Sequence, residues 1–349
     1  MPGNSLMEKI WDKLLYLCRL TNDPVVKVYN GYGNRDVAVI YGHVFLLSPL
    51  PRKKYRQNYI TNLFALLRLF MVRTAKSAKV SFNWNGEVHH ATAAEDGFFK
   101  FEWNPGADFK PGWHKVEVIL NELNGKPGSG ITGKGLVFIP DEHQYACISD
   151  IDDTFLISHS SNLRKRLYVL LTENAHSRKP FDGVVHHYQL LSKAASTINI
   201  PNPFFYVSSS EWNLYNYISD FSKKNELPDG VYLLGQLKTF KQVFKTGQNN
   251  HSTKFMRIAR IMEAFPMQHF ILLGDDSQMD PAIYASIVQH FPDQIKYVYL
   301  RHVSKKNHAA VKEIVKKINE AGVICCYFTH SGDAIRHSKE TGLIEMVET

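Results

Sequence analysis

The sequence predicts an α/β protein built from a small β-sandwich followed by a parallel sheet with helices on both faces. Up to Pro140, short alternating apolar segments are separated by Gly, Pro and Asn turns. After Pro140, apolar strands alternate with helical segments, a pattern typical of a three-layer parallel sheet. The chain has 349 residues, enough for two domains of ordinary size. We therefore expect a β-sandwich domain over residues 25–140 and an α/β domain over residues 141–349.

The first domain is expected to contain about seven short strands. An Asn85-Gly86 pair between alternating segments predicts a tight hairpin. The clearest strand candidates are Val37–Phe45, Lys79–Trp84, Phe98–Trp103, Lys115–Leu120 and Gly135–Ile139.

Two segments of this N-terminal part have helical spacing. Within residues 1–24, Ser5–Leu20 is expected to be an amphipathic helix, and not a signal peptide, because charges interrupt its apolar part. The helix expected over Asn58–Lys76 has an apolar face and carries Arg68 and Arg73. It either packs against the protein or lies on an anionic membrane, and the sequence leaves both open.

The second domain is expected to be a parallel sheet whose ligands bind at the carboxyl ends of its strands. Its expected strands are Ala146–Ser149, Phe204–Val207, Val231–Leu234, Phe270–Leu273, Ile295–Leu300 and Val323–Phe328. The expected helices are Trp212–Lys224, Lys254–Phe265, Pro281–His290 and Ala309–Ala321.

Crowded carboxylates follow the first of these strands, in the stretch Asp150-Ile151-Asp152-Asp153-Thr154. Carboxylates this close repel one another unless a cation lies among them. One aspartate can attack phosphorus, and a second can pass a proton to the leaving alcohol and take one from water. Mg²⁺ would relieve the repulsion. A solvated aspartate-rich turn is the alternative.

Three more clusters lie at strand ends or at a helix start. Ser208 is the first residue beyond an apolar strand and can donate to a phosphate oxygen, and Ser209 follows it. Lys254 opens a helix, where a positive charge opposes the dipole unless carboxylates or phosphate lie nearby. Asp275 follows a strand and a glycine, and Asp280 either caps the next helix or orients a metal-bound water.

Taken together, these motifs resemble those of the haloacid dehalogenase-like phosphohydrolases, and most closely the App1-like phosphatidate phosphatase family. The matching stretches are DIDDT at Asp150–Thr154, YVSSSEW at Tyr206–Trp212, KFMRIARIMEAFP at Lys254–Pro266 and GDDSQMDP at Gly274–Pro281. Upstream, Val28–Asn34 and Glu95–Trp103 look like the β-rich region of bacterial members. The resemblance implies a Rossmann-like, three-layer sheet.

It also implies roles for the matching residues. Asp150 would be the nucleophile, Asp152 the general acid/base and Lys254 the charge stabiliser. Ser208, with Ser209, would bind the phosphate. Mg²⁺ would be held by Asp150, Asp275 and the backbone carbonyl of Asp152. Thr154, Asp276 and Asp280 would orient these ligands without binding the ion themselves.

The family resemblance implies phosphatidic acid as substrate, but the sequence departs from the family at two positions. Asp276 stands where the family usually has serine, and Glu211 where it often has proline. The basic and then apolar stretch Ser158–Leu171 would suit either a lipid or an ordinary helix. A soluble phosphatase acting on a sugar phosphate, nucleotide or phosphoprotein, and a non-catalytic phospholipid-binding module, remain the alternatives.

Composition and charge indicate which classes of partner and which cellular compartment to expect. The formal charge of +8 suits an anionic partner such as a phosphate ester or a membrane surface, and by itself is too little to indicate nucleic acid. With 4 cysteines and no metal-binding spacing, we expect a reducing compartment and a cytoplasmic protein, peripheral at the inner membrane face if lipid is its substrate. The sequence contains no run of 18 apolar residues, so it predicts no membrane-spanning helix.

Overall fold

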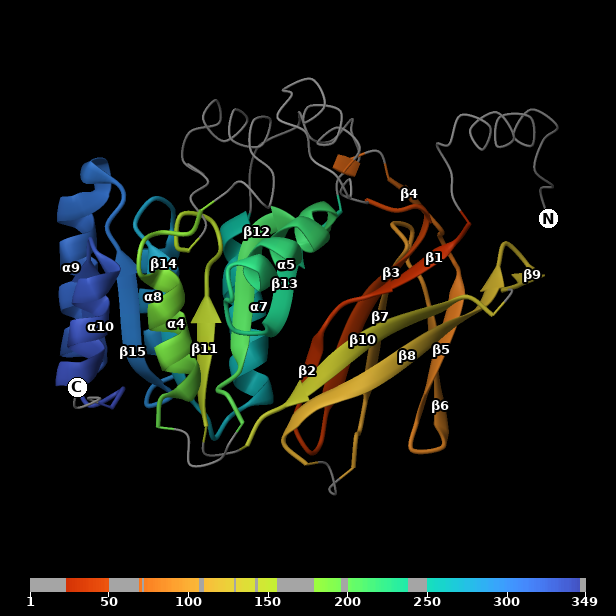
Figure 1. The fold of residues 1–349 in the computed structure, drawn as a ribbon, viewed down its shortest axis with the longest axis horizontal. Helices are drawn as coiled ribbons and strands as arrows, with labels where there is room; N and C mark the ends of the chain where they lie inside the picture. The colour runs from red at the N-terminus through yellow and green to blue at the C-terminus, as the bar shows by residue number, and fades with distance from the viewer. Residues whose placement is uncertain are drawn as a thin grey trace.

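The structure of the chain is a computed structural model. It describes residues 23–49, 69–70, 72–106, 110–128, 130–141, 144–155, 179–195, 200–237 and 250–345. Two sheets lie side by side in it, the N-terminal one at the right of Figure 1 and the C-terminal one at the left.

The N-terminal sheet is mixed and has 10 strands, in the order β1-β3-β2-β10-β8-β5-β6, with β4 and β7 paired to β3 and β9 to β8. The prediction of a β-rich region is confirmed, although the hydrogen bonds join all the strands in one sheet where a sandwich has two. The strands are β1 (Val25–Val28), β2 (Gly31–Gly33), β3 (Ala38–Leu47), β4 (Arg73–Thr74), β5 (Lys79–Trp84), β6 (Glu87–Thr92), β7 (Phe98–Trp103), β8 (Gly112–Leu123), β9 (Lys126–Pro127) and β10 (Thr132–Ile139).

The predicted hairpin is present between β5 and β6, where Trp84 pairs with Glu87. Asn85 and Gly86 both have positive φ, 50° and 91°, which is what a two-residue turn matching the strand twist requires. On the β5 side of this hairpin, Val80 and Phe82 are fully buried in the core of the sheet.

The helix predicted over residues 58–76 is only partly testable. Residues 58–68 and 71 lie outside the described ones, as do residues 1–22 of the predicted N-terminal helix. Leu69 and Phe70 are helical, but Arg73 and Thr74 form β4 and pair with Leu47 and Phe45 of β3. The prediction was therefore wrong at its C-terminal end, because backbone pairing with β3 overrides the helical spacing there.

The C-terminal sheet has 6 strands, all parallel, in the order β13-β12-β11-β14-β15-β16. It confirms the predicted α/β class and the presence of all six predicted strands. The predicted end of the second strand at Val207 was wrong, because β12 continues to Glu211 and so includes Ser208. From β11 the chain moves outward to one side and then returns to build the other, so the direction changes between β11 and β14, where ligands bind in such sheets. The strands are β11 (Tyr145–Ser149), β12 (Phe204–Glu211), β13 (Gly230–Gly235), β14 (His269–Asp275), β15 (Ile295–Arg301) and β16 (Ile324–Phe328).

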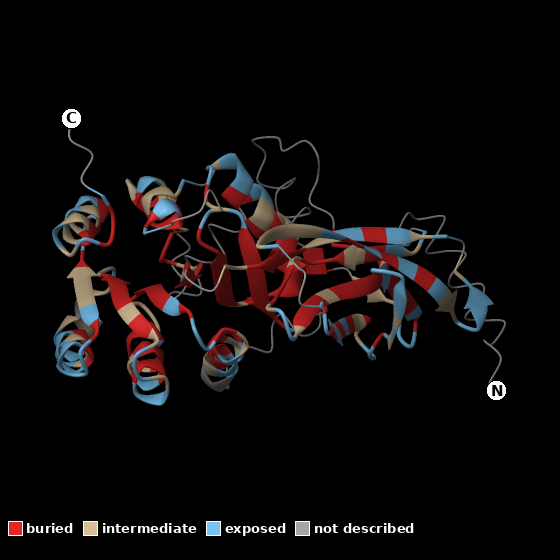
Figure 2. Ribbon diagram, turned by 90° about the horizontal axis from the view of Figure 1, so that it is seen from below, coloured by how far each residue is buried: buried red, intermediate tan, exposed pale blue. Residues whose placement is uncertain are grey.

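Helices cover both faces of this sheet, and their buried residues face the strands (Figure 2). Alternate strand residues enter two different cores: Cys147 and Ile271 lie in one, Ile148 and Leu272 in the other. The first core includes residues of α4 (Val184–Lys193), α5 (Tyr215–Lys224) and α10 (Ser331–Glu340). The second includes residues of α7 (Asn250–Ala264), α8 (Asp280–His290) and α9 (His308–Glu320), and the short 3-10 turns are η1 (Trp212–Leu214) and η2 (Lys305–Asn307).

The N-terminal sheet contributes to both cores. Tyr29 lies in the first and Tyr32 in the second. Strand β10 ends at Ile139 and β11 begins at Tyr145, so the chain passes from one sheet to the other around the boundary expected at Pro140. The division into separate domains stays a prediction. Within the described residues, no helix has the length and apolar character needed to cross a bilayer.

Candidate active site

Asp150 is placed by the end of β11, at the carboxyl edge of the parallel sheet. Its backbone N–H donates to the carbonyl of Leu273 in the neighbouring β14 at 2.8 Å, so the strand pairing continues one residue past β11. Its side chain is buried, with the residue only 2% exposed. The chain then turns at Asp153, whose φ of 60° lies in the left-handed region that aspartate tolerates. The chain thus places the Asp150 carboxylate at the buried end of β11 and then reverses direction at Asp153.

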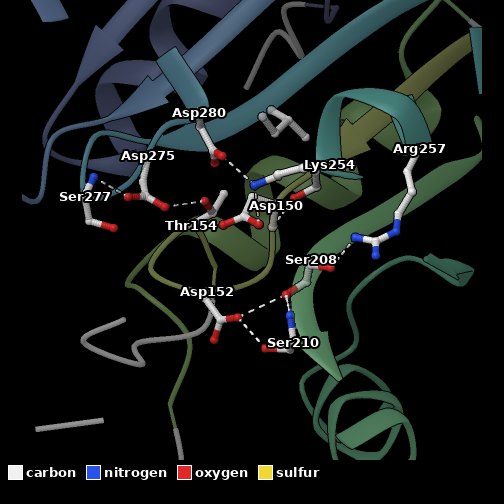
Figure 3. Close-up of polar contacts among 12 residues, drawn as sticks. Asp150, Asp152, Thr154, Ser208, Ser210, Lys254, Arg257, Asp275, Ser277 and Asp280 are labelled. Atoms are coloured by element: carbon white, nitrogen blue, oxygen red, sulfur yellow. Dashed lines mark hydrogen bonds and ion pairs between the residues drawn. The ribbon is translucent and has the colours of Figure 1, made fainter. Parts of the chain in front are cut away.

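Lys254 reaches this carboxylate from the first turns of α7 (Figure 3). Its Nζ lies 2.7 Å from Asp150 Oδ1 and also donates to Asp280 Oδ1, with all three side chains buried. Burial alone would lower the pKa of Lys254, but the carboxylates of Asp150 and Asp280 outweigh it and raise the pKa, so the ammonium group stays charged. The predicted interaction of this lysine with the acidic cluster is present.

Asp275 ends β14 and completes the cluster. It accepts hydrogen bonds from Thr154 Oγ1 at 3.1 Å and from the backbone N–H of Ser277 at 2.5 Å. Burial and the nearby Asp280 raise its pKa to about 7. Gly274 before it is required for close packing, since a Cβ there would lie 2.7 Å from the Tyr284 ring and 2.9 Å from Asp280 Oδ2.

The carboxylates of Asp150, Asp275 and Asp280 could hold a metal ion. Each offers an oxygen, and these oxygens lie within 4.8 Å of one another. Asp150 Oδ2 and Asp280 Oδ2 are buried and accept no hydrogen bond from the described residues. Burial raises the pKa of Asp150, and the neighbouring Asp280 raises it further. An all-oxygen set with unsatisfied acceptors fits a hard cation such as Mg²⁺, which would supply the missing positive charge.

Asp152 is held apart from this cluster. Its Oδ2 accepts hydrogen bonds from Ser208 Oγ at 3.1 Å and from Ser210 Oγ at 2.8 Å (Figure 3). The side chain of Asp152 therefore faces the serines, and the predicted metal contact through its backbone carbonyl stays a prediction. A carboxylate that is half-buried and oriented by two hydroxyls suits a proton-transfer role better than a ligand role.

Ser210 was missed by the sequence analysis, which proposed Ser208 and Ser209. The predicted strand ended at Val207, whereas β12 continues to Glu211. The two-residue repeat of a strand therefore places Ser208 and Ser210 on one side and Ser209 on the other. Both Ser208 and Ser210 are fully buried, whereas Ser209 is half-exposed. Phosphate binding by Ser209 stays a prediction, and the alternation along Phe204–Glu211 was the signal available for Ser210.

Arg257 was also missed, although it follows Lys254 by three positions on α7 and so lies on the same side of the helix. The pairing of β12 with β13 shifts register between Val207 and Glu211. Arg257 Nη1 donates to the carbonyl of Ser208 at 3.1 Å within this irregular stretch. The guanidinium thereby satisfies a carbonyl in the segment where regular pairing is interrupted.

Asp276, where the resemblance leads us to expect serine, belongs to a different network from Asp275. It is fully buried and accepts from four donors: His302 Nδ1 at 2.6 Å, Tyr327 OH at 2.5 Å, and the backbone N–H groups of Val303 and Ser304 at 2.7 and 2.8 Å. These bonds explain how a second adjacent aspartate is accommodated. Its charge is satisfied at the ends of β15 and β16, not among the other carboxylates.

Arg301, at the end of β15, holds the opposite side of the aspartate loop. Its Nε donates to the carbonyl of Thr154 at 3.1 Å and its Nη2 to Ser331 Oγ at 2.8 Å. The guanidinium is 3% exposed and lies over the rings of Phe181 and Phe328. No local pattern in the sequence indicates this role, because the contact depends on β15 lying beside β14.

Comparison with known proteins agrees with this arrangement. Residues 145–302 match the family model described as phosphatidate phosphatase APP1, catalytic domain. The phosphatidate phosphatase APP1 of Saccharomyces cerevisiae is 31% identical over 156 residues, 44% of this chain and 25% of that protein. An uncharacterized protein of Schizosaccharomyces pombe is 21% identical over 235 residues, 67% of this chain and 37% of that protein. The chain therefore spans only a quarter to about a third of the length of these relatives.

Solved structures give much weaker likeness. A carbohydrate acetylesterase from Xanthomonas citri has a TM-score of 0.30 at 8% identity, covering 88% of this chain and 68% of that one. A Porphyromonas gingivalis protein of unknown function has a TM-score of 0.18 at 7% identity, covering 38% of this chain and 60% of its own.

Proposed function

We propose that the chain is a member of the APP1 family whose catalytic-domain model residues 145–302 match, and that it is a phosphatase that removes phosphate from phosphatidic acid. The order of its parallel strands, with the direction change between β11 and β14, supports a Rossmann-like sheet of the haloacid dehalogenase type.

One observation carries the proposal. The ammonium group of Lys254 bridges Asp150 and Asp280 at the carboxyl ends of β11 and β14, beside Asp275. The cluster gathers one positive group and several buried carboxylates at one point. An ordinary solvated turn would leave them exposed and apart. A cation bound here would, together with Lys254, stabilise the negative charge of a phosphoryl group.

The reaction would proceed in two steps. A carboxylate oxygen of Asp150 attacks phosphorus, the bond from phosphorus to the alcohol oxygen breaks, and Asp152 gives that oxygen its proton. Water then attacks the phosphoryl group on Asp150 and loses a proton to Asp152. The bond from phosphorus to Asp150 breaks, which releases inorganic phosphate and restores both aspartates.

The surrounding residues orient these groups. Ser208 and Ser210 fix the side chain of Asp152, and Lys254 and Thr154 fix Asp150 and Asp275 respectively. Mg²⁺ held by Asp150 and Asp275 would neutralise charge on the phosphoryl oxygens. Asp280, with its unsatisfied Oδ2, would support the ion from the same cluster.

Membrane association is a further part of the proposal. The net charge of +8 supports peripheral contact with an anionic surface. Arg68 and Arg164–Arg166 lie outside the described residues, and Arg73 lies in β4. Vesicle co-sedimentation of variants with reversed charge at Arg68, Arg73 and Arg164–Arg166 tests this contact. Unchanged binding after reversal at these positions would remove the membrane contact from the proposal.

The central experiment measures phosphate release from short-chain phosphatidic acid beside a panel of soluble phosphomonoesters. It is run with Mg²⁺ or EDTA, with Asp150→Asn as the matched isosteric control. Mg²⁺-dependent release chiefly from the lipid, lost in the variant, is the expected result. Release chiefly from soluble esters would keep the chemistry and replace the substrate. No release by folded, Mg²⁺-binding protein would favour a non-catalytic phospholipid-binding module.

A further inference from the structure

The N-terminal sheet lies outside the matched catalytic region, yet it contacts the segment that directly follows the two serines. That segment is η1 and the start of α5, beginning at Trp212, two residues after Ser210. Its position relative to β12 therefore bears on where the serine hydroxyls lie.

The main contact is between Tyr29 and Trp212. Their rings are stacked, with centroids 4.1 Å apart and an interplanar angle of 17°. Tyr29 also contacts the ring of Tyr215 at 4.5 Å, and its hydroxyl is hydrogen-bonded to His43 Nδ1 at 2.9 Å. Tyr29 is 1% exposed, so the stack is enclosed by protein on all sides.

Polar contacts fasten the same segment. Asn213 Nδ2 donates to the carbonyl of Leu69 at 2.9 Å, and Asn216 Nδ2 to the carbonyl of Pro49 at 3.3 Å. The ammonium group of Lys27 lies 5.1 Å from the centre of the Tyr215 ring. Lys27, Tyr29, Pro49 and Leu69 thus hold one short stretch of the catalytic part through aromatic, amide and cation contacts.

The pairing of β12 with β13 is irregular at the serines. Between Val207 and Glu211 the register of β12 against β13 shifts, so the ladder does not fix Ser208 to Ser210 in the regular way. Arg257 binds this irregular stretch at the Ser208 carbonyl. Trp212 ends it on the other side, and Trp212 is anchored by Tyr29.

We infer that Tyr29 and Trp212 are positioning residues, through which the N-terminal sheet sets the serine hydroxyls against Asp152. The N-terminal sheet then contributes to catalysis by positioning these hydroxyls, and is not only an attached domain. The catalytic consequence rests on the proposed phosphatase chemistry, whereas the structural consequence does not.

Tyr32 lies in the same stretch as Tyr29, Val28–Asn34, and provides a matched control. It lies three positions from Tyr29, is 4% exposed, and also packs on the catalytic part. Its ring contacts Phe205 and Phe265, with centroids 5.5 and 5.8 Å away, and not the segment after Ser210. A purely structural interface predicts similar effects of changing either tyrosine.

The experiment compares Tyr29→Leu, Tyr29→Phe and Tyr32→Leu in the full chain. We expect Tyr29→Leu to lower kcat for short-chain phosphatidic acid about tenfold at nearly unchanged KM, since it removes the stack. Tyr29→Phe keeps the ring and is expected to stay within about twofold of wild type. Tyr32→Leu is expected to lower the midpoint of thermal unfolding without lowering kcat by more than about twofold.

Amide hydrogen exchange, measured by mass spectrometry on peptides covering residues 208–216, gives a readout that needs no activity. Tyr29→Leu should speed exchange there and Tyr32→Leu should not. Equal effects of both variants on exchange and kcat would overturn the inference. A wild type that releases no phosphate would end the proposed function, and the exchange comparison would still decide the positioning role. If Tyr29→Leu does not fold, Trp212→Phe and Tyr32→Phe replace the two leucine variants, and their kcat values and exchange rates are compared in the same way.

Discussion

Lys254 Nζ lies 2.7 Å from Asp150 Oδ1, although 104 positions separate the two residues in the chain. The same ammonium group bonds to Asp280, so one charge stabilises two buried carboxylates. The reactive cluster thus depends on a contact between α7 and the end of β11.

Replacing Lys254 by Met is expected to lower kcat by at least about 100-fold, because the developing charge on the phosphoryl group loses its side-chain partner. The free energy of unfolding should fall by about 3–5 kcal/mol, since Asp150 and Asp280 are left unpaired. Mg²⁺ should recover part of that loss by supplying positive charge. Phosphate release and thermal unfolding with and without Mg²⁺ measure these effects. Lys312→Met, at an exposed position of α9, is the control and should change neither.

Ser210→Ala is expected to reduce kcat about tenfold, because Asp152 loses a hydrogen bond of 2.8 Å that orients it. Ser209→Ala is the matched control, one residue away on the other side of β12, and should stay within about twofold of wild type. Steady-state kinetics on the same substrate compares them. A larger loss in Ser209→Ala than in Ser210→Ala would instead support phosphate binding by Ser209.

Asp276→Ser should destabilise the protein by about 3 kcal/mol, because the shorter hydroxyl cannot reach the donors that now surround the buried carboxylate. Asp276→Asn keeps the size and one acceptor oxygen, so we expect a smaller loss. Denaturant unfolding measures both. An Asp276→Ser variant as stable as wild type would show that the network around His302 and Tyr327 adds no stability.

Stability should also depend on pH through His43 and His187. Burial lowers the pKa of each to about 3, and in the unfolded chain both return to about 6.5. Because the unfolded state then binds more protons, the free energy of unfolding falls as pH drops below 6.5 toward 3. By linkage the loss at pH 5 is about 2 kcal/mol for each histidine. Denaturant unfolding at pH 7.5 and pH 5 measures it. The raised pKa of Asp275 contributes with the opposite sign over this range, so the informative quantity is the difference between wild type and variant. His43→Gln should change the stability difference between pH 7.5 and pH 5 by about 2 kcal/mol, and an unchanged pH dependence in that variant would contradict the assignment.

The six parallel strands could be predicted from the sequence, because each is a short apolar run bounded by turns, and two cores require apolar residues on both faces. The pattern also placed Asp150, Ser208 and Asp275 near the carboxyl ends of such strands, although Ser208 lies within β12 and Asp275 is the last residue of β14. Since carboxyl ends of parallel strands meet at one edge, local pattern was enough to place these residues near one another.

The pairing of the side chains depends on tertiary contacts. Asp275 and Asp276 are neighbours in sequence, yet Asp275 bonds to Thr154 beside the other buried carboxylates and Asp276 bonds to His302, just after β15. Tyr29 stacks on Trp212, and Arg301 holds the carbonyl of Thr154. Such contacts join residues far apart in the chain, and their geometry depends on strand order and helix placement. Local spacing carries no information on either, so the sequence located the site and several of its residues but not the contacts made by Asp276, Tyr29 and Arg301.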